Sequence, residues 1–269
     1  MTHSTAKVTL ITGGSAGLGR AIAAAFAARG DRIALVARDP QRLQAAADEL
    51  RSQGSEVTTF AGDVTRQEDV DRIFHAVSEK FDRLDVLVNN AGKSTRGAIL
   101  DTTPEAFQAL WELNFLAAVR CTRAAATMLL EGHGSVVFIG SLASKVAGPY
   151  LGGYAATKFP LAAYAQQLRL ETAERGLHTL LVCPGPIERE DAGERYADAA
   201  AGLPDAAKKP GGGVKLRRLA PELVARRIVQ ACEARQPELV LPGKARLLFA
   251  LSDLWPTLGD WLLRKQLRG

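Results

Sequence analysis

A tyrosine and a lysine stand four residues apart, at Tyr154 and Lys158, and Ser141 lies thirteen residues before the tyrosine. Residues at this spacing share one face of a helix, so the ammonium and the phenol can reach the same small volume. A phenol has a pKa of about 10, and a cation about 4 Å away favours the phenolate by roughly 4 kcal/mol at an effective dielectric of 20. The pair therefore predicts a tyrosine with a lowered pKa that gives and takes protons near neutrality. Such a pair can also share a helix by chance, so it does not establish a site alone.

A glycine-rich stretch far upstream, Thr12–Gly19, offers a second kind of chemistry. It follows an apolar run at 8–11 and precedes an alanine-rich run at 20–29, which predicts a strand, a tight turn and a helix. Glycines let a ligand approach the backbone, and free N–H groups at a helix N-terminus attract a pyrophosphate. The residues expected to form this cofactor site are Gly13, Ser15, Gly17, Leu18 and Gly19.

Five motifs in this order and spacing resemble the short-chain dehydrogenase/reductase family, and the resemblance runs from about residue 7 to residue 241. The motifs are the glycine turn, Asp63-Val64, the run 89–92, the Ser141/Tyr154/Lys158 set and Pro184-Gly185. On these motifs the chain is identified as a member of that family. Membership implies a nicotinamide cofactor and the interconversion of a carbonyl group and an alcohol.

The resemblance implies a role for each catalytic residue. Ser141 hydrogen-bonds the substrate oxygen, Tyr154 is the general acid or base, and Lys158 holds the nicotinamide ribose and lowers the pKa of Tyr154. Asn114 matches the fourth catalytic position, where it helps to hold a water that passes protons to Lys158; a polar packing residue is the alternative. The remaining implied cofactor contacts are Asp63 and Val64 at the adenine, Asn90, Ala91 and Gly92 near the adenosine ribose, and Pro184, Gly185 and Ile187 at the nicotinamide.

The choice of cofactor is expected to depend on Arg38, which follows the strand-like run 32–37. NAD-preferring relatives carry an acidic residue at the position of Ala37, and this chain does not. The planar guanidinium of Arg38 suits a 2′-phosphate instead, which predicts NADP(H). A surface arginine without a ligand is the alternative.

Apolar strand-like runs alternate with helical patterns along most of the chain. The strands are expected at 7–12, 32–37, 56–60, 84–88, 134–140, 178–183 and 237–241, and the helices at 18–29, 40–53, 66–81, 103–131, 152–175 and 221–235. This alternation predicts an α/β fold: one doubly wound Rossmann-type domain over 1–243, with a seven-stranded, mostly parallel sheet covered by helices on both faces. Ligands bind outside the carboxyl ends of such strands, where Gly13, Asn90, Ser141 and Pro184 fall.

Two segments depart from this alternation. Residues 188–213 are polar and glycine-rich, and the resemblance implies a lid loop that closes over the substrate; a plain surface loop is the alternative. This segment includes Arg189, where the family often has a threonine that touches the carboxamide. In the extension 244–269, leucines and tryptophans recur at helical spacing with a break near Pro256. Such an amphipathic extension can pack on its own domain or on a twin subunit. It can also contact a membrane surface through 244–267, because basic residues flank the apolar ones.

Composition excludes several classes of function. The net charge of +5 is spread along helices with interleaved acidic residues, which is typical of a solvated surface and not of a nucleic-acid site. Three scattered cysteines predict buried thiols in a reducing compartment, and four separated histidines predict no metal site. The N-terminus has no apolar segment of a signal peptide, and no apolar run approaches the ~20 residues that span a bilayer. We therefore expect a cytoplasmic protein, with association to a membrane surface as the alternative.

The function expected from these features is NADP-dependent oxidation and reduction of a hydrophobic small molecule, between a ketone and a secondary alcohol. Apolar residues at the expected pocket positions, such as Leu142, Val146 and Leu151, favour the hydrophobic substrate. The alternative is a non-catalytic NADP-binding regulatory protein on the same fold. The family resemblance also implies a homodimer or homotetramer, formed through the helices near 103–131 and 152–175.

Overall fold

The computed structural model describes residues 6–189, 196, 200, 202–204, 207 and 216–268, with side chains through 265. Within this part of the chain, seven strands form one sheet in the order β3-β2-β1-β4-β5-β6-β7, and every neighbouring pair is parallel. The strands are β1 (Val8–Thr12), β2 (Arg32–Ala37), β3 (Val57–Ala61), β4 (Val86–Asn89), β5 (Ser135–Ile139), β6 (His178–Pro184) and β7 (Glu238–Leu241). The predicted fold class is confirmed, and each predicted strand lies within two residues of the observed bounds.

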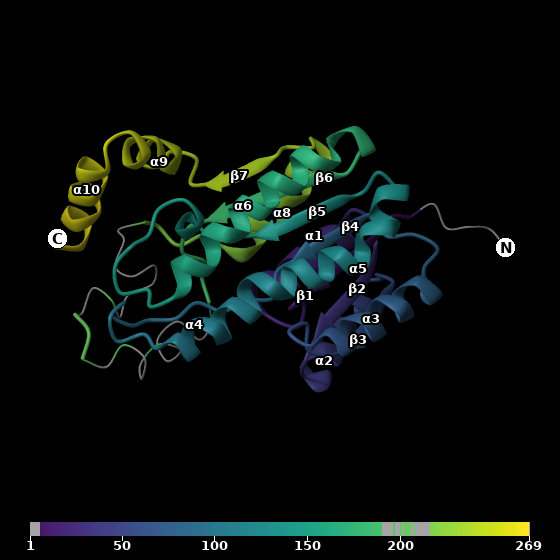
Figure 1. The fold of residues 1–269 in the computed structure, drawn as a ribbon. Coiled ribbons are helices and arrows are strands. Elements are labelled where there is room, and N and C mark those ends of the chain that lie inside the picture. Colours follow the sequence, from purple (N-terminus) through teal and green to yellow (C-terminus); the bar gives the residue numbers. More distant parts are fainter. Residues whose placement is uncertain are drawn as a thin grey trace.

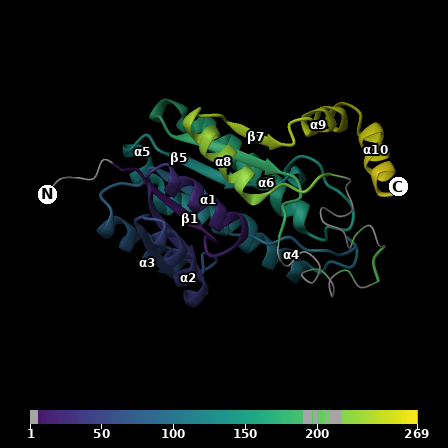
Figure 2. The same ribbon diagram turned by 180° about the vertical axis from the view of Figure 1, so that it is seen from behind.

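Helices cover both faces of the sheet. Helices α1 (Gly17–Ala28), α2 (Pro40–Ser52) and α8 (Pro221–Glu233) pack on one face, with α1 and α8 in front in Figure 2. Helices α3 (Gln67–Lys80), α5 (Ala117–Glu131) and α6 (Tyr154–Thr172) pack on the other face, which is in front in Figure 1. Alternate residues of each strand belong to the two cores. Leu10 and Val36 pack in the core beneath α3, α5 and α6, whereas Ile11 and Leu35 pack in the core beneath α1 and α2.

The helix expected at 103–131 contains a local irregularity. It consists of α4 (Pro104–Trp111), a π-helical turn (Glu112–Leu116) and α5. Contrary to the expectation from the apolar runs, residues Pro104–Glu131 are long and apolar enough to cross a membrane, the one such stretch in the described residues. Its apolar side packs on the sheet through Cys121, Ala125 and Leu129, as the apolar side of a core helix does.

The three cysteines are free and buried, as expected. Burial raises the pKa of the Cys121, Cys183 and Cys232 thiols to about 12. The thiols are therefore protonated at neutral pH and act as small apolar packing groups.

The C-terminal extension forms two helices that break where the sequence predicts. Helix α9 (Ala245–Leu254) and helix α10 (Pro256–Arg268) meet at Trp255. Gly259 permits their close packing, because a Cβ there would lie 2.8 Å from the Cα of Ser252. The pair, called the C-terminal hairpin below, extends beyond the carboxyl end of β7, far from the N-terminus (Figure 1).

Candidate active site

The glycine turn joins β1 to α1 as a close-packed backbone unit. Gly13 has a left-handed backbone with φ +66°, and its N–H donates to the Val36 carbonyl at 2.8 Å. A Cβ on Gly19 would lie 2.1 Å from the Gly13 carbonyl oxygen, so this helix can start here only with glycine. No side chain caps the N-terminus of α1. A glycine cradle that presents uncapped N–H groups fits the pyrophosphate of a dinucleotide.

Asn90 and Ala91 hold this turn from the neighbouring strand. The Asn90 amide donates to the carbonyl oxygens of Thr12 at 3.0 Å and Gly13 at 3.1 Å. The Thr12 hydroxyl accepts from the backbone N–H groups of Asn90 and Ala91, at 3.0 and 3.1 Å. These bonds connect β1 with β4, the strands between which the direction of chain progression reverses and where such folds bind ligands.

The residues expected at the adenosine end lie together beyond β2 and β3. The Arg38 guanidinium lies 3.7 Å from an Asp63 carboxylate oxygen, and the Arg38 side chain is 70% exposed. Asp63 also accepts hydrogen bonds from the Thr65 N–H and hydroxyl, at 2.9 and 2.8 Å. The side chain of Val64 is buried in the core, which leaves its backbone to meet a ligand.

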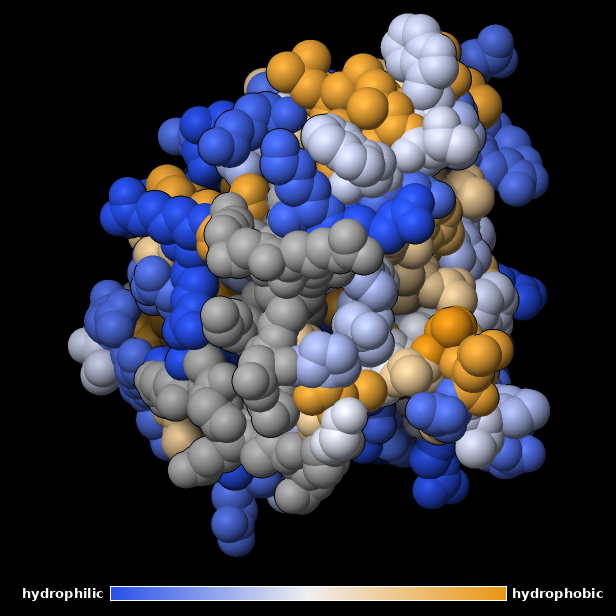
Figure 3. All heavy atoms as spheres, turned by 90° about the vertical axis from the view of Figure 1, so that its left-hand side faces the viewer, coloured by the Kyte–Doolittle hydropathy of each residue, from blue (hydrophilic) through white to orange (hydrophobic). Residues whose placement is uncertain are grey.

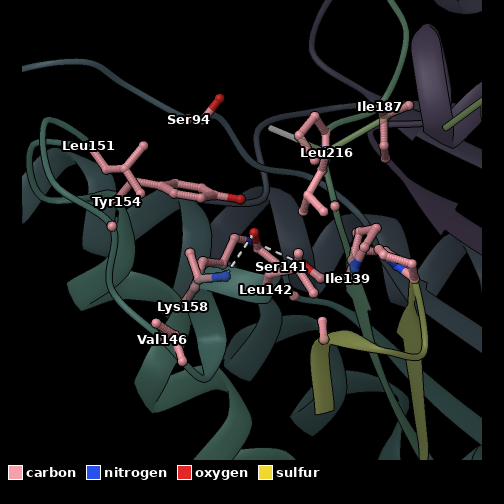
Figure 4. Close-up of a pocket in the computed structure, with 18 of the residues that line it drawn as sticks. Ser94, Ile139, Ser141, Leu142, Val146, Leu151, Tyr154, Lys158, Ile187 and Leu216 are labelled. Atoms are coloured by element: carbon pink, nitrogen blue, oxygen red, sulfur yellow. Dashed lines mark hydrogen bonds between the residues drawn. The ribbon is translucent and has the colours of Figure 1, made fainter. Parts of the chain in front are cut away.

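Ser141, Tyr154 and Lys158 converge on one side of a pocket (Figure 4). Ser141 lies two residues after Ile139, the last residue of β5, and its hydroxyl accepts from the Ala143 N–H at 3.1 Å. Tyr154 is the first residue of α6, and its ring reaches into the pocket between Ser94 and Ser141. The buried ammonium of Lys158 donates to the Ile139 carbonyl at 2.8 Å and lies 5.8 Å from the centroid of the Tyr154 ring. The sequence prediction that these three side chains meet agrees with this geometry.

The pKa of Tyr154 differs from the prediction. Burial raises the pKa of the phenol above its usual value, and a hydrogen bond with Ser141 opposes this rise only in part. The nearby cations that favour the phenolate are Arg189 and Arg96. The predicted lowering of the Tyr154 pKa is contradicted, because the effect of burial outweighs that of these cations. The Lys158 ammonium itself donates to the Ile139 carbonyl.

Burial has the opposite effect on Lys158 and lowers its pKa to about 8. In the unfolded chain the lysine pKa is roughly 10.4. Below pH 8 Lys158 is protonated in both the folded and the unfolded protein, so the folded state bears the full free-energy cost of burying the charge. Between about pH 8 and pH 10 the unfolded state binds more protons, so stability rises with pH. In urea unfolding, the wild type is therefore expected to gain about 3 kcal/mol relative to Lys158→Met across this window. Parallel pH dependence of the two proteins would contradict the burial of a charged lysine.

Asn114 lies in the π-helical turn and is buried. Its amide donates to the Lys93 carbonyl at 2.9 Å and the Thr157 hydroxyl at 3.0 Å, and its oxygen accepts from the Lys93 N–H at 2.8 Å. A Cβ on Gly92 would lie 2.9 Å from that oxygen. Asn114 therefore connects the loop after β4 with α6, next to Lys158. π-Helical turns are frequent at functional sites.

The pocket is a cavity of about 500 Å³ with mostly apolar walls. Its polar lining includes the three converging side chains described above, and also Asn90, Lys93 and Arg189. The expected cofactor residues that line the pocket are Leu18, Asn90, Gly92, Pro184, Gly185 and Ile187, together with Tyr154 and Lys158. The expected residues that lie outside its lining are Gly13, Ser15, Gly17, Gly19, Arg38, Asp63, Val64, Ala91 and Asn114.

Sequence reasoning missed two groups of lining residues. The first is a polar group from the loop after β4: Ser94 is hydrogen-bonded to the Tyr196 hydroxyl, and the buried Arg96 guanidinium lies 4.1 Å from the centroid of the Tyr196 ring. No motif marks this loop. The second group comes from the C-terminal hairpin and includes Leu248, Phe249 and Leu263. The sequence shows the helical spacing of these residues, but it does not show that they pack against the pocket. The expected lid at 188–213 falls largely outside the described residues.

Comparison with known proteins places this chain in a family. Residues 7–199 match the short chain dehydrogenase family. The chain is 32% identical over 267 residues to the dehydrogenase/reductase SDR family member 7B of Danio rerio, covering 94% of this chain and 82% of that protein. The chain therefore belongs to the short-chain dehydrogenase/reductase family, and it is an NAD(P)-dependent oxidoreductase.

Solved structures agree with this assignment. A short-chain dehydrogenase from Streptomyces avermitilis superposes with a TM-score of 0.79 at 31% identity, covering 97% of this chain and 98% of that one. L-sorbose reductase from Gluconobacter frateurii, complexed with NADPH and L-sorbose, gives a TM-score of 0.77 at 29% identity, covering 88% of this chain and 95% of that one.

Proposed function

We propose that the protein interconverts a ketone and a secondary alcohol on a hydrophobic small molecule, with NADP(H) as cofactor. The observation that carries this proposal is the convergence of Ser141, Tyr154 and Lys158 at one end of a pocket with apolar walls. A polar end suits a single reacting oxygen, and apolar walls suit the rest of the substrate.

In the proposed reaction each side chain acts on a stated atom. The bound nicotinamide supplies or accepts the hydride at the substrate carbon. The Ser141 hydroxyl donates a hydrogen bond to the substrate oxygen, and the Tyr154 hydroxyl gives that oxygen its proton in reduction and takes it back in oxidation. Burial keeps the phenol protonated at neutral pH, which is the form that reduction needs.

Lys158 and Asn114 are proposed to position the other groups. One N–H of the Lys158 ammonium donates to the Ile139 carbonyl, and its other N–H groups can donate to the nicotinamide ribose hydroxyls. Asn114 is hydrogen-bonded to Lys93 and to Thr157, the neighbour of Lys158 in α6, which keeps the loop after β4 against α6.

The proposed cofactor contacts follow the geometry of the strand ends. Arg38 would bind the 2′-phosphate, since its exposed guanidinium lies beyond β2 beside Asp63. The L-sorbose reductase that resembles this chain holds NADPH, which supports the same preference here. The other proposed contacts are Gly13, Ser15, Gly17, Leu18 and Gly19 for the pyrophosphate, Asp63, Val64, Asn90, Ala91 and Gly92 for the adenosine, and Pro184, Gly185 and Ile187 for the nicotinamide.

A panel of carbonyl compounds tests the function. Aromatic and long-chain aliphatic ketones are expected to consume NADPH, and polyhydroxylated ketones are expected to react poorly because the pocket walls are apolar. Turnover of the polyhydroxylated ketones alone would contradict the substrate class. Tight binding of NADPH with no turnover of any compound would favour the non-catalytic regulatory protein.

One wall residue of the C-terminal hairpin provides a test of the substrate side. Leu248→Ala removes apolar area from the pocket. The loss of about 1.5 kcal/mol of hydrophobic binding free energy is expected to raise KM for a hydrophobic ketone roughly tenfold. NADPH affinity should not change. Leu254→Ala on the exposed side of the same helix is the matched control and should leave KM unaltered. Equal KM values for all three proteins would remove the hairpin from the substrate site.

Assembly and location are also proposals. We propose a homodimer or homotetramer formed through α4, α5 and α6. In support, Trp111 on α4 is 37% exposed, and Phe159 and Leu170 on α6 are 43% and 69% exposed. Light scattering of the full chain measures the mass. A cytoplasmic location with peripheral membrane contact through 244–267 completes the proposal.

A further inference from the structure

The C-terminal hairpin has two apolar faces with different surroundings. Its inner face lines the pocket, and Phe249 on this face is buried in the core beside the sheet. Its outer face holds five of the eleven large hydrophobic side chains that are exposed in the described residues, all within a stretch of fifteen residues. They are Leu247, Leu254, Trp255, Leu258 and Trp261, with exposures of 71%, 68%, 57%, 40% and 52%. An exposed apolar surface of this kind is typical of a site that binds another protein or a membrane.

Leu247 connects the two faces. It lines the pocket and is also 71% exposed, so it stands at the rim where the pocket meets the outer face. Lys244, one turn earlier, also lines the pocket. The pocket therefore opens beside the exposed apolar surface and not at a distant part of the molecule.

The charges around this surface favour an anionic occupant. Residues 244–268 contain five basic and two acidic side chains, a net charge of +3 out of the +5 of the whole chain. The Lys265 ammonium lies 5.0 Å from the centroid of the Trp261 ring, so a cation stands directly beside an exposed tryptophan. Figure 3 shows hydrophobic side chains gathered on the upper part of the face where α9 and α10 lie, with hydrophilic ones around them. Leucine and tryptophan bordered by lysine and arginine are typical of helices that lie in a bilayer surface.

The size of the surface suits a shallow insertion into a bilayer. The five exposed side chains present about 600 Å², from typical side-chain areas and the exposures given above. A helix that lies in a bilayer surface needs only an apolar strip of this kind, flanked by basic side chains.

We propose that the outer face of the C-terminal hairpin docks on an anionic phospholipid bilayer, and that hydrophobic substrate passes between the bilayer and the pocket beneath Leu247. Docking specifies the lipid and the surface of the membrane contact proposed above for 244–267. The passage of substrate rests on the proposed function.

Sedimentation of the full chain with vesicles tests the docking. Vesicles of equal parts phosphatidylcholine and phosphatidylserine are expected to bind the wild type, and vesicles of phosphatidylcholine alone to bind it more weakly. Trp255→Ser with Trp261→Ser should reduce binding at least tenfold. Ile99→Ser with Leu100→Ser removes two apolar side chains elsewhere that are at least as exposed, and it should leave binding unchanged. A wild type that stays in solution, or equal loss in both double variants, would overturn the proposal.

Fluorescence identifies the surface that is in contact. The chain has three tryptophans, so Trp111→Phe leaves only the two in the hairpin. Brominated phospholipids in the same vesicles are expected to quench their emission, and unquenched emission from bound protein would mean that another face docks. If light scattering instead shows that the Trp255→Ser/Trp261→Ser variant loses a subunit without vesicles, the surface is an interface between copies and the proposal is wrong.

Kinetics separate docking from substrate passage. For a ketone dissolved in the vesicles, the double tryptophan variant should show a raised KM with unchanged kcat, and for a water-soluble ketone both constants should match the wild type. Equal constants with the vesicle ketone would overturn the passage of substrate and leave docking in place. An absence of turnover in every protein would contradict the proposed function, while the sedimentation and quenching results would still decide docking.

Discussion

Tyr154→Phe is expected to lower kcat for ketone reduction by about 10³-fold while the Kd for NADPH stays within a factor of two. The substitution removes only the hydroxyl that is proposed to protonate the substrate oxygen, and a positioned general acid contributes about 10² to 10⁴ in rate. The ring still fills its place between Ser94 and Ser141, so the pocket keeps its shape. Steady-state kinetics and a fluorescence titration with NADPH measure the two quantities.

Tyr164→Phe is the matched control for this experiment. Tyr164 belongs to the same helix, but its ring packs edge-to-face against Phe138, with the centroids 5.7 Å apart. Its loss of a hydroxyl should leave kcat unchanged. Normal turnover by Tyr154→Phe would show that another group donates the proton. Loss of NADPH binding would show that Tyr154 serves the fold of the cofactor site.

Arg38→Asp is expected to shift the ratio of kcat/KM for NADPH over NADH by roughly a hundredfold or more toward NADH. A charge-assisted hydrogen bond to a phosphate contributes about 1.5–3 kcal/mol, and the substitution adds a second carboxylate close to Asp63, which repels the 2′-phosphate. The kinetic constants with both cofactors and one ketone measure the ratio.

Arg42→Asp provides the control for this charge reversal. Arg42 is equally exposed on the following helix and pairs with Asp39 at 3.5 Å, so its loss changes the local charge by the same amount. Its cofactor ratio should stay close to that of the wild type. A similar shift in both variants would mean a general electrostatic effect, and no shift in either would remove Arg38 from cofactor choice.

The fold was predictable because its elements are determined by local patterns. The run 33–37 is apolar throughout, as burial on both faces of a parallel sheet requires, and β2 consists of this run and Arg32 before it. The π-helical turn was not predictable, since no local pattern marks it. Asn114 within it bonds with Lys93 and Thr157, which come from distant parts of the chain. The helical period of 103–131 alone indicates one regular helix.

The candidate site was predictable where spacing decides the geometry and not where tertiary packing does. The four-residue spacing of Tyr154 and Lys158 brings them to one pocket. The pKa of Tyr154 depends instead on burial and on Arg96 and Arg189, which no spacing relates to it. Likewise, the direction of the Lys158 ammonium is set by the Ile139 carbonyl at the end of β5. The pocket wall from the C-terminal hairpin exists only because α9 follows β7 at the carboxyl edge of the sheet.

A crystal structure of the protein with NADPH and an unreactive hydrophobic carbonyl analogue tests the proposed mechanism most directly. We expect the Tyr154 and Ser141 hydroxyls both to lie within about 3 Å of the analogue's oxygen, with the Lys158 ammonium on the ribose hydroxyls. A Tyr154 hydroxyl turned away from that oxygen, or an analogue bound outside the pocket that Tyr154 lines, would contradict it.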